Sequence, residues 1–183
     1  MAMAAMHPLF VAATILVDSG PMTDSRGLVR LRRNLRYLEA FRGAGDAVPA
    51  FRPMLTRDYP GLPDERIKVL SQRTHLIDAR GRLRPLFDPA LVTRLEAVEY
   101  DALLAAQWPL FDTLAHVPMM LIRTSLTDQL RQETFEEMIR RRPDAVGVTI
   151  SGQGSPALLD QSEEFEAIGQ FIRQVMSLRR SVR

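Results

Sequence analysis

The chain has 183 residues, 46% of them hydrophobic, which is enough for one core domain that carries a small additional lobe. It contains no cysteine, so disulfide bonds and thiolate catalysis are excluded and a reducing cytosol is the expected compartment. The formal net charge is only +2, and Lys68 is the single lysine among 24 basic residues, so the high isoelectric point reflects arginine and not a large excess of positive charge.

The N-terminal segment, MAMAAMHPLFVAATILV, is apolar but has no basic residue at its start, as a signal peptide would. His7 and Pro8 interrupt it, and it is too short to cross a membrane. We therefore expect a soluble, cytoplasmic protein without a membrane partner.

The first half of the chain predicts one strand followed by a helical lobe. Residues 11–18 are apolar on both faces, which is typical of a parallel strand covered on both sides. Between residues 22 and 108 the pattern changes to helical segments separated by proline and glycine. One helix begins near Pro63, and another begins with Asp88 as its cap and Pro89 in its first turn. An earlier helix carries an apolar stripe of Leu28, Leu31, Leu35 and Leu38.

The second half alternates strand and helix. Residues 117–124 and 144–151 are predicted strands, and the helix between them places Phe135, Met138 and Ile139 inward. The last predicted helix is capped by Ser162, with its inward residues being Phe165, Ile168, Ile172 and Val175. This alternation indicates parallel strands joined by right-handed crossovers, so the predicted fold is α/β with about three parallel strands.

Two arginine-rich runs, residues 30–36 and 140–142, raise the question of nucleic-acid binding. Both runs lie within helices that also carry apolar stripes, so they fit the solvated face of an amphipathic helix better than a phosphate-binding track. We expect no nucleic-acid partner.

The segment VTISGQGSPALL, residues 148–159, has the strand, turn and helix order of many α/β active sites. Its GQGSPA portion formally satisfies the dinucleotide pattern G-x-G-x-x-G/A. That pattern needs a later strand with an acidic residue to hold the ribose, and no strand follows here. A dinucleotide site is therefore excluded, and no cofactor or metal is expected.

Ser155 is a poor nucleophile in this segment. In a nucleophile elbow the serine is flanked as G-x-S-x-G and the next residue donates its N–H to the oxyanion hole. Here the glycines lie one and three positions before Ser155, and Pro156 has no N–H. From the residues alone, a turn serine that bonds nearby backbone is the better interpretation.

The order of motifs along the chain resembles the C-terminal part of α/β-hydrolases of the esterase and lipase type. RTSLTDQL resembles the segment that bears the triad acid, RRPDA resembles the end of the following helix, and GQGSPALL resembles the turn of the catalytic histidine. AAMHPLFVAATILVDSGP resembles the helix and strand that follow the nucleophile elbow, and WPLFDTLAHVPMMLIR resembles the exit from a helical cap.

This resemblance implies a partial hydrolase core formed by residues 1–21 and 109–183, with residues 22–108 as a helical cap or lid. It places Asp128 at the position of the triad acid and Ser155 at the position of the histidine, and Thr124 stands where the family has glycine. The nucleophile would precede Met1, so we expect a truncated or degenerate form that is inactive alone, whose intact relatives cleave small ester-like substrates. Whether the chain is an enzyme stays open at this point.

Two alternatives accompany this interpretation. Without a histidine beside it, Asp128 would cap the next helix or stay solvated, and the chain's own histidines, His7, His75 and His116, are expected at surface or boundary positions. The chain would then serve as a binding or assembly module. In it, the Arg-rich helical lobe or the free edge of the strand at residues 12–17 would hold a partner, either a second copy or a separately encoded N-terminal half.

Overall fold

The computed structural model describes residues 1–41, 46–97 and 105–181. The chain divides into two compact units, Met1–Asp24 with Leu104–Arg183, and Ser25–Leu103, which we call the sheet unit and the insert unit. The boundaries expected at residues 21 and 109, and the role of the insert as a cap, stay predictions.

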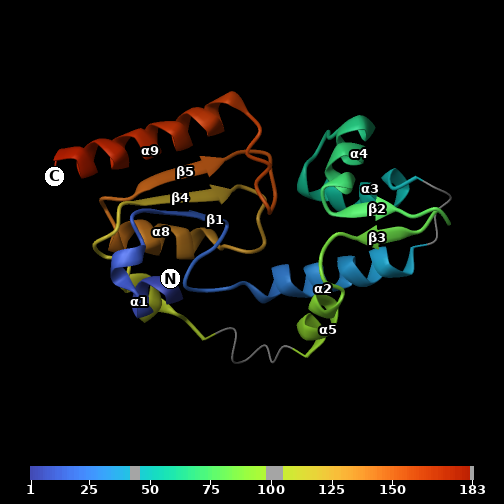
Figure 1. The fold of residues 1–183 in the computed structure, drawn as a ribbon, viewed down its shortest axis with the longest axis horizontal. Coiled ribbons are helices and arrows are strands. Elements are labelled where there is room, and N and C mark those ends of the chain that lie inside the picture. The colour runs from blue at the N-terminus through green and yellow to red at the C-terminus, as the bar shows by residue number, and fades with distance from the viewer. Residues whose placement is uncertain (42–45, 98–104, 182–183) are drawn as a thin grey trace. The chain divides into compact units, whose positions relative to one another are not determined.

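The sheet unit is built on three parallel strands in the order β1-β4-β5 (Figure 1). β1 (Thr14–Val17) pairs with β4 (Met119–Thr124), which pairs on its other side with β5 (Val146–Ile150). The predicted α/β fold with a parallel three-stranded sheet is therefore confirmed. β1 is half-buried instead of covered on both sides, because it lies at an edge of this sheet.

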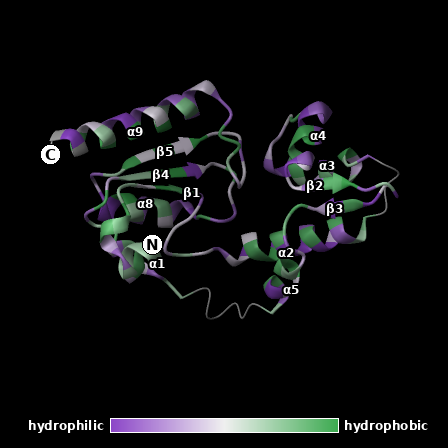
Figure 2. Cartoon of the chain, in the orientation of Figure 1, coloured by the Kyte–Doolittle hydropathy of each residue, from purple (hydrophilic) through white to green (hydrophobic). Residues whose placement is uncertain are grey.

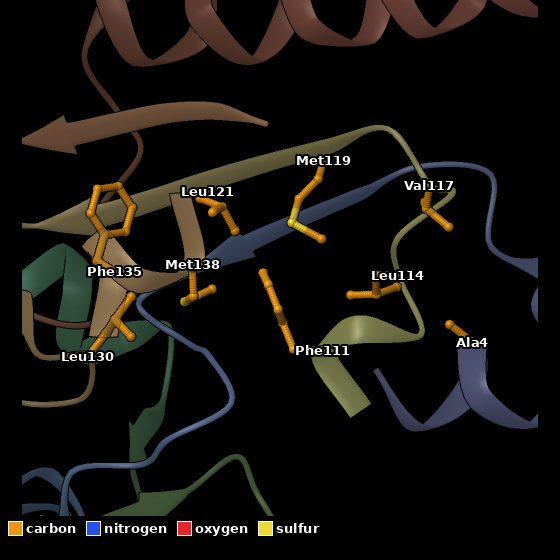
Figure 3. Packing of buried hydrophobic residues seen from close by; sticks show 9 residues of the cluster. All are labelled: Ala4, Phe111, Leu114, Val117, Met119, Leu121, Leu130, Phe135 and Met138. Atoms are coloured by element: carbon orange, nitrogen blue, oxygen red, sulfur yellow. The ribbon is translucent and has the colours of Figure 1, made fainter. Parts of the chain in front are cut away.

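The central strand, β4, is buried along its whole length, and its side chains alternate between two hydrophobic clusters. On one face Met119 and Leu121 pack against α1 (Ala2–Met6), α7 (Trp108–Asp112) and α8 (Gln132–Arg141), as Figure 3 shows for Ala4, Phe111 and Met138. On the other face Met120 and Ile122 pack against α9 (Ser162–Ser181). A short 3₁₀ turn, η1 (Pro8–Phe10), joins α1 to β1.

The two faces of the sheet explain most of the predicted pattern. Phe135, Met138 and Ile139 of α8 do face the core, as their spacing predicts. In Figure 2 hydrophobic residues follow β1 and β4, whereas they alternate with hydrophilic ones along α9.

None of the helices within the described ranges is long and apolar enough to cross a membrane.

The orientation predicted for α9 was wrong in part. Phe171 and Val175 are buried against the sheet, whereas Phe165 and Ile172, expected to face inward, are 62% and 46% exposed. The helix carries two apolar stripes, and only the one that includes Ile168, Phe171 and Val175 contacts the strands. Its start also differs: Ser162 is already helical, and the N–H of Gln161 bonds to the Glu164 carboxylate.

The end of α8 is held by a buried arginine. The Arg142 guanidinium donates to the carbonyl oxygens of Leu114 and Val117, the latter at 2.9 Å. It also forms a bidentate ion pair with the Asp144 carboxylate, with hydrogen bonds of 2.9 and 2.7 Å. Hydrogen bonding to Arg142 lowers the pKa of the Asp144 carboxyl. Arg142 thus joins the segment that enters β4 to the segment that enters β5.

The insert unit is mainly helical, as predicted, with α2 (Ser25–Ala40), α3 (Val48–Asp58), α4 (Asp64–Gln72) and α5 (Ala90–Glu96). Its core gathers Leu38, Ala47, Ala50, Phe51 and Ile67. At the start of α5 the Asp88 carboxylate accepts the N–H of Ala90, as expected of a cap. The predicted continuation of that helix over residues 98–104 lies outside the described residues.

The insert unit also contains an antiparallel hairpin that the sequence pattern did not predict, β2 (His75–Ile77) with β3 (Leu83–Pro85). Its turn is closed by Asp78, whose carboxylate accepts the N–H groups of Arg80 and Arg82. These bonds, together with the guanidinium groups of Arg82 and Arg84, hold the pKa of Asp78 well below its usual range. Gly81 supplies the left-handed backbone conformation, φ 72, that the turn requires.

Candidate functional site

The candidate site lies where the three parallel strands end. Ligands of α/β folds bind outside the carboxyl ends of the strands, because the loops there converge from neighbouring strands. In the sheet unit these loops are residues 18–24 after β1, 125–131 after β4 and 151–161 after β5.

The loop after β1 is fixed by Asp18. Its carboxylate accepts the N–H of Thr124 at 2.7 Å and the Thr124 hydroxyl at 2.8 Å, and its own N–H donates to the carbonyl of Ile122 at 2.9 Å. Both Asp18 and Thr124 are buried. Two residues on, Gly20 lies against α8, where a Cβ atom would come 2.8 Å from the Met138 sulfur.

The loop after β4 carries Asp128, which is half-buried. Asp24 holds this loop at its far end: its N–H donates to the carbonyl of Gln129 at 3.3 Å, and its buried carboxylate pairs with Arg131 at 2.9 Å. Inside the loop the Arg123 side chain donates to the carbonyl of Leu130 at 3.1 Å. The segment that follows Asp128 is therefore anchored both to the loop after β1 and to the end of β4.

The loop after β5 carries Ser155, which is half-buried and lies between the buried Gly154 and the exposed Pro156. The Gln153 side chain shapes this loop: its oxygen accepts the N–H of Leu158 at 3.0 Å, and its nitrogen donates to Glu164 of α9 at 2.7 Å. The Ser155 hydroxyl makes no side-chain hydrogen bond within the part of the chain that the structure describes.

The structure brings the Asp128 and Ser155 loops together. The N–H of Ser125 donates to the carbonyl of Ile150 at 2.8 Å, and the N–H of Leu126 donates to the carbonyl of Gln153 at 2.9 Å. The Ser125 hydroxyl accepts the N–H of Gly152 at 2.9 Å. The two loops thus run side by side at the carboxyl edge, but the roles assigned to Asp128 and Ser155 stay predictions.

The histidines of the sheet unit lie near the amino ends of the strands, opposite the carboxyl ends where the candidate site lies. His116 precedes β4. The six residues of β4 span roughly 20 Å from the amino end to the carboxyl end of the strand. His7 follows α1, whose Ala4 packs with Leu114 and Val117 near the amino end of β4 (Figure 3). His75 belongs to the insert unit. In the described ranges of the sheet unit, no histidine lies on the loops that carry Asp128 and Ser155.

Two residues of this edge were missed from the sequence, Asp18 and Asp24. A signal for Asp18 was present, because a carboxylate that directly follows an apolar strand of a parallel sheet lies at the carboxyl edge. Among the described residues no cluster of three or more histidine, cysteine, aspartate or glutamate side chains is arranged to hold a metal ion. The expectation of no metal and no cofactor stays a prediction.

Comparison with known proteins finds similarity in solved structures. An α/β hydrolase from Novosphingobium aromaticivorans superposes with a TM-score of 0.75 at 28% identity, over 94% of this chain and 60% of its own. E-2-(acetamidomethylene)succinate hydrolase gives a TM-score of 0.67 at 22% identity, over 93% of this chain and 60% of its own. An esterase from M. tuberculosis gives 0.52 at 17% identity, over 95% and 57%.

The chain therefore spans about three fifths of the length of the structures that it resembles. No family model and no curated protein sequence matches it.

Proposed function

We propose that this chain, whose fold is that of the α/β-hydrolase superfamily, descends from ester- or acyl-bond hydrolases and does not complete a Ser-His-Asp triad from its own residues. The observation that carries the proposal is the pairing of the Asp128 loop with the Ser155 loop at the carboxyl edge. In the triad an imidazole passes the proton between nucleophile and leaving group while a carboxylate orients it. The Ser155 hydroxyl is too weak a base for that step near neutral pH.

The position of the other histidines supports the same conclusion. His7 and His116 lie toward the amino edge of the sheet, so neither shares the edge of Asp128. Loss of one triad member lowers turnover by roughly 10⁴- to 10⁶-fold in serine hydrolases. We therefore infer that the chain as it stands does not hydrolyse esters by the triad route.

The first test is an ester-hydrolysis assay on the full chain. The purified chain is incubated with p-nitrophenyl acetate and p-nitrophenyl butyrate, and we expect release of nitrophenol at the rate given by the heat-denatured chain. Asp128→Ala is the matched variant and is expected to give the same rate. Turnover above this background that disappears in Asp128→Ala overturns the proposal.

The second test restores the missing groups. Ser155→His is placed in a fusion with the N-terminal part of a similar hydrolase, which supplies the nucleophile elbow and the oxyanion loop. We expect ester turnover in the folded fusion with histidine, none with Ser155→Ala, and loss of the restored activity when Asp128→Ala is added. A folded fusion with histidine that stays inactive contradicts the roles assigned to these two positions.

A second candidate function, an assembly module, is favoured by the edge of the sheet. β1 has a partner strand on one side only within the described chain, and Ile15 and Val17 on it pack toward the α9 face. Similar solved structures are longer than this chain. We propose as occupant a segment of the same fold that adds a parallel strand beside β1.

Size-exclusion chromatography with light scattering separates the outcomes for this module. A monomer that binds an added N-terminal half supports the proposed occupant, whereas a stable dimer of the chain alone replaces it by self-pairing. A monomer that binds no such half contradicts the module. The hydrolase proposal has three further parts. We propose a cytoplasmic location, small ester-like substrates in intact relatives, and no nucleic-acid or membrane partner.

A further inference from the structure

The insert unit contains a cavity of about 340 Å³ between α2, the hairpin and α5. Pockets of this size hold small organic molecules. Most of its lining is apolar, and the polar groups are His75 together with Glu39, Arg82 and Arg84. The apolar lining consists of Leu35, Leu38, Leu83, Pro85, Phe87, Pro89 and Val92.

His75 is the buried polar group of this cavity, with only 5% of the residue exposed. Two aromatic rings hold its imidazole in place through T-shaped contacts. The distance between ring centroids is 5.2 Å to Phe51 and 5.5 Å to Phe87. One ring nitrogen, Nδ1, lies 3.0 Å from the Thr74 hydroxyl. The orientation of the imidazole is therefore set by the protein before any ligand arrives.

The hydrogen bonds around Thr74 assign the tautomer of His75. The Thr74 hydroxyl donates its only hydrogen to the carbonyl of Ser71 at 3.3 Å. In that arrangement the hydroxyl accepts from the imidazole, and on this basis we assign the proton of the neutral ring to Nδ1. The lone pair is left on Nε2. Burial lowers the pKa of His75, which favours this neutral form.

Nε2 has no hydrogen-bond partner in the described part of the chain. Every fully buried side-chain nitrogen and oxygen there does have a partner, so Nε2 is not sealed in the interior. An acceptor nitrogen without a partner, on a ring that lines a cavity, is available to a molecule inside it.

The arginines at this cavity do not make it an anion site. The guanidinium groups of Arg82 and Arg84 both donate to the Asp78 carboxylate, at 2.9 and 3.1 Å. Glu39 adds a negative charge to the lining. Beside these charged groups the cavity offers mostly apolar walls and the uncharged acceptor Nε2 of His75.

We propose that this cavity binds a small neutral molecule with an aromatic or branched aliphatic body and one hydroxyl group, which donates a hydrogen bond to Nε2 of His75. The site belongs wholly to the insert unit, so it does not depend on the fate of the triad. Phenols and compact alcohols are the chemical class that fits.

The test uses the full ¹⁵N-labelled chain and the imidazole nitrogens as reporters. The sequence has only three histidines, so a His75→Phe variant assigns the His75 signals directly. In the free chain we expect the proton on Nδ1. On addition of p-cresol we expect a saturable shift of the Nε2 signal in the direction of a hydrogen-bonded acceptor. p-Xylene, which has nearly the same shape without the hydroxyl, is expected to leave Nε2 unchanged.

Two variants complete the design. His75→Phe keeps the ring volume and removes the acceptor, and it should weaken p-cresol binding by about tenfold without weakening p-xylene binding. Val92→Phe fills the cavity and should abolish the binding of both probes while the His75 signals remain those of the folded chain. A proton found on Nε2, no saturable shift with p-cresol, or an equal shift with p-xylene overturns the proposal.

Discussion

The carboxylate of Asp18 accepts two hydrogen bonds from one residue, Thr124, at its backbone N–H and at its hydroxyl, over 2.7 and 2.8 Å. Both residues are buried, and 106 positions separate them in the chain. This pair joins the carboxyl ends of β1 and β4 and therefore sets where the Asp128 loop begins. It also gives Thr124 a role, because a glycine at this position would lack the second bond.

Asp18→Ala is expected to destabilise the chain by roughly 3 kcal/mol, because the N–H and the hydroxyl of Thr124 would stay buried without a partner. Alanine also tolerates the left-handed backbone of residue 18, φ 46, less well than aspartate does. The measurement is urea denaturation followed by circular dichroism. Thr124→Val, which removes the hydroxyl alone, should cost about 1 kcal/mol. Equal losses in the two variants would show that the backbone bond adds nothing.

Arg142→Met is expected to cost about 3 kcal/mol, because it leaves the carbonyl oxygens of Leu114 and Val117 without their donor. The matched variant Asp144→Asn removes the charge of the partner, whose side chain is 61% exposed, and should cost less than about 1 kcal/mol. The measurement is the urea concentration at the midpoint of unfolding, compared between the two variants and the parent chain. A larger loss in Asp144→Asn would mean that the ion pair, and not the carbonyl contacts, holds this corner.

Stability is expected to fall as the pH is lowered through the ordinary His75 pKa of 6.5. The pKa of His75 is lowered in the folded chain, so between that lowered value and 6.5 the unfolded chain binds more protons and acid favours unfolding. The contribution is complete above 6.5 and is lost below it. The ionisable groups that line the cavity with His75 are Glu39, Arg82 and Arg84.

The His75 prediction is measured by urea denaturation at about pH 7.5 and about pH 5.5, a window above the carboxyl pKa values. His75→Phe should show a smaller loss of stability between these two conditions than the parent chain does. The pKa itself follows from the ring-proton shifts of the three histidines during a pH titration. A His75 that titrates at or above 6.5 contradicts the prediction.

The two apolar stripes of α9 should respond differently to truncation. Phe171→Ala is expected to cost about 3–5 kcal/mol, because the ring is 6% exposed and packs against Met120 and Ile122. Phe165→Ala should change stability by less than about 1 kcal/mol, since that ring is 62% exposed. Thermal unfolding of both variants checks this, and a comparable loss in Phe165→Ala would show that the outer stripe is covered in solution.

The parallel sheet could be predicted from the sequence because each strand is an apolar run that ends in a turn and is followed by a helix or the insert. The hairpin could not, since strands of three residues are too short to show alternation, and the bonds of Asp78 that close its turn leave no periodic pattern. For α9 the spacing of apolar residues fits two stripes equally well. Only the position of the sheet selects Phe171 over Phe165.

For the candidate site, the resemblance placed Asp128 and Ser155 at two positions of one triad and thereby implied that their loops are neighbours. The groups that hold those loops were not predictable in the same way. Asp18 meets Thr124, and Asp24 meets Arg131, over more than a hundred residues of chain, so no local pattern reports the contact. His75 was predicted at a surface or boundary position, but it is buried, because the rings of Phe51 and Phe87 enclose it.

The side chain of Gln153 has one more implication. It fastens the β5 loop to Leu158 and to Glu164 of the last helix, and none of these bonds involves the side chain at position 155. The hydrogen bonds that hold the main chain there do not depend on the side chain at that position. Substitutions at position 155 are therefore expected to leave the Gln153 bonds in place, so that the loop can present different side chains on the same scaffold.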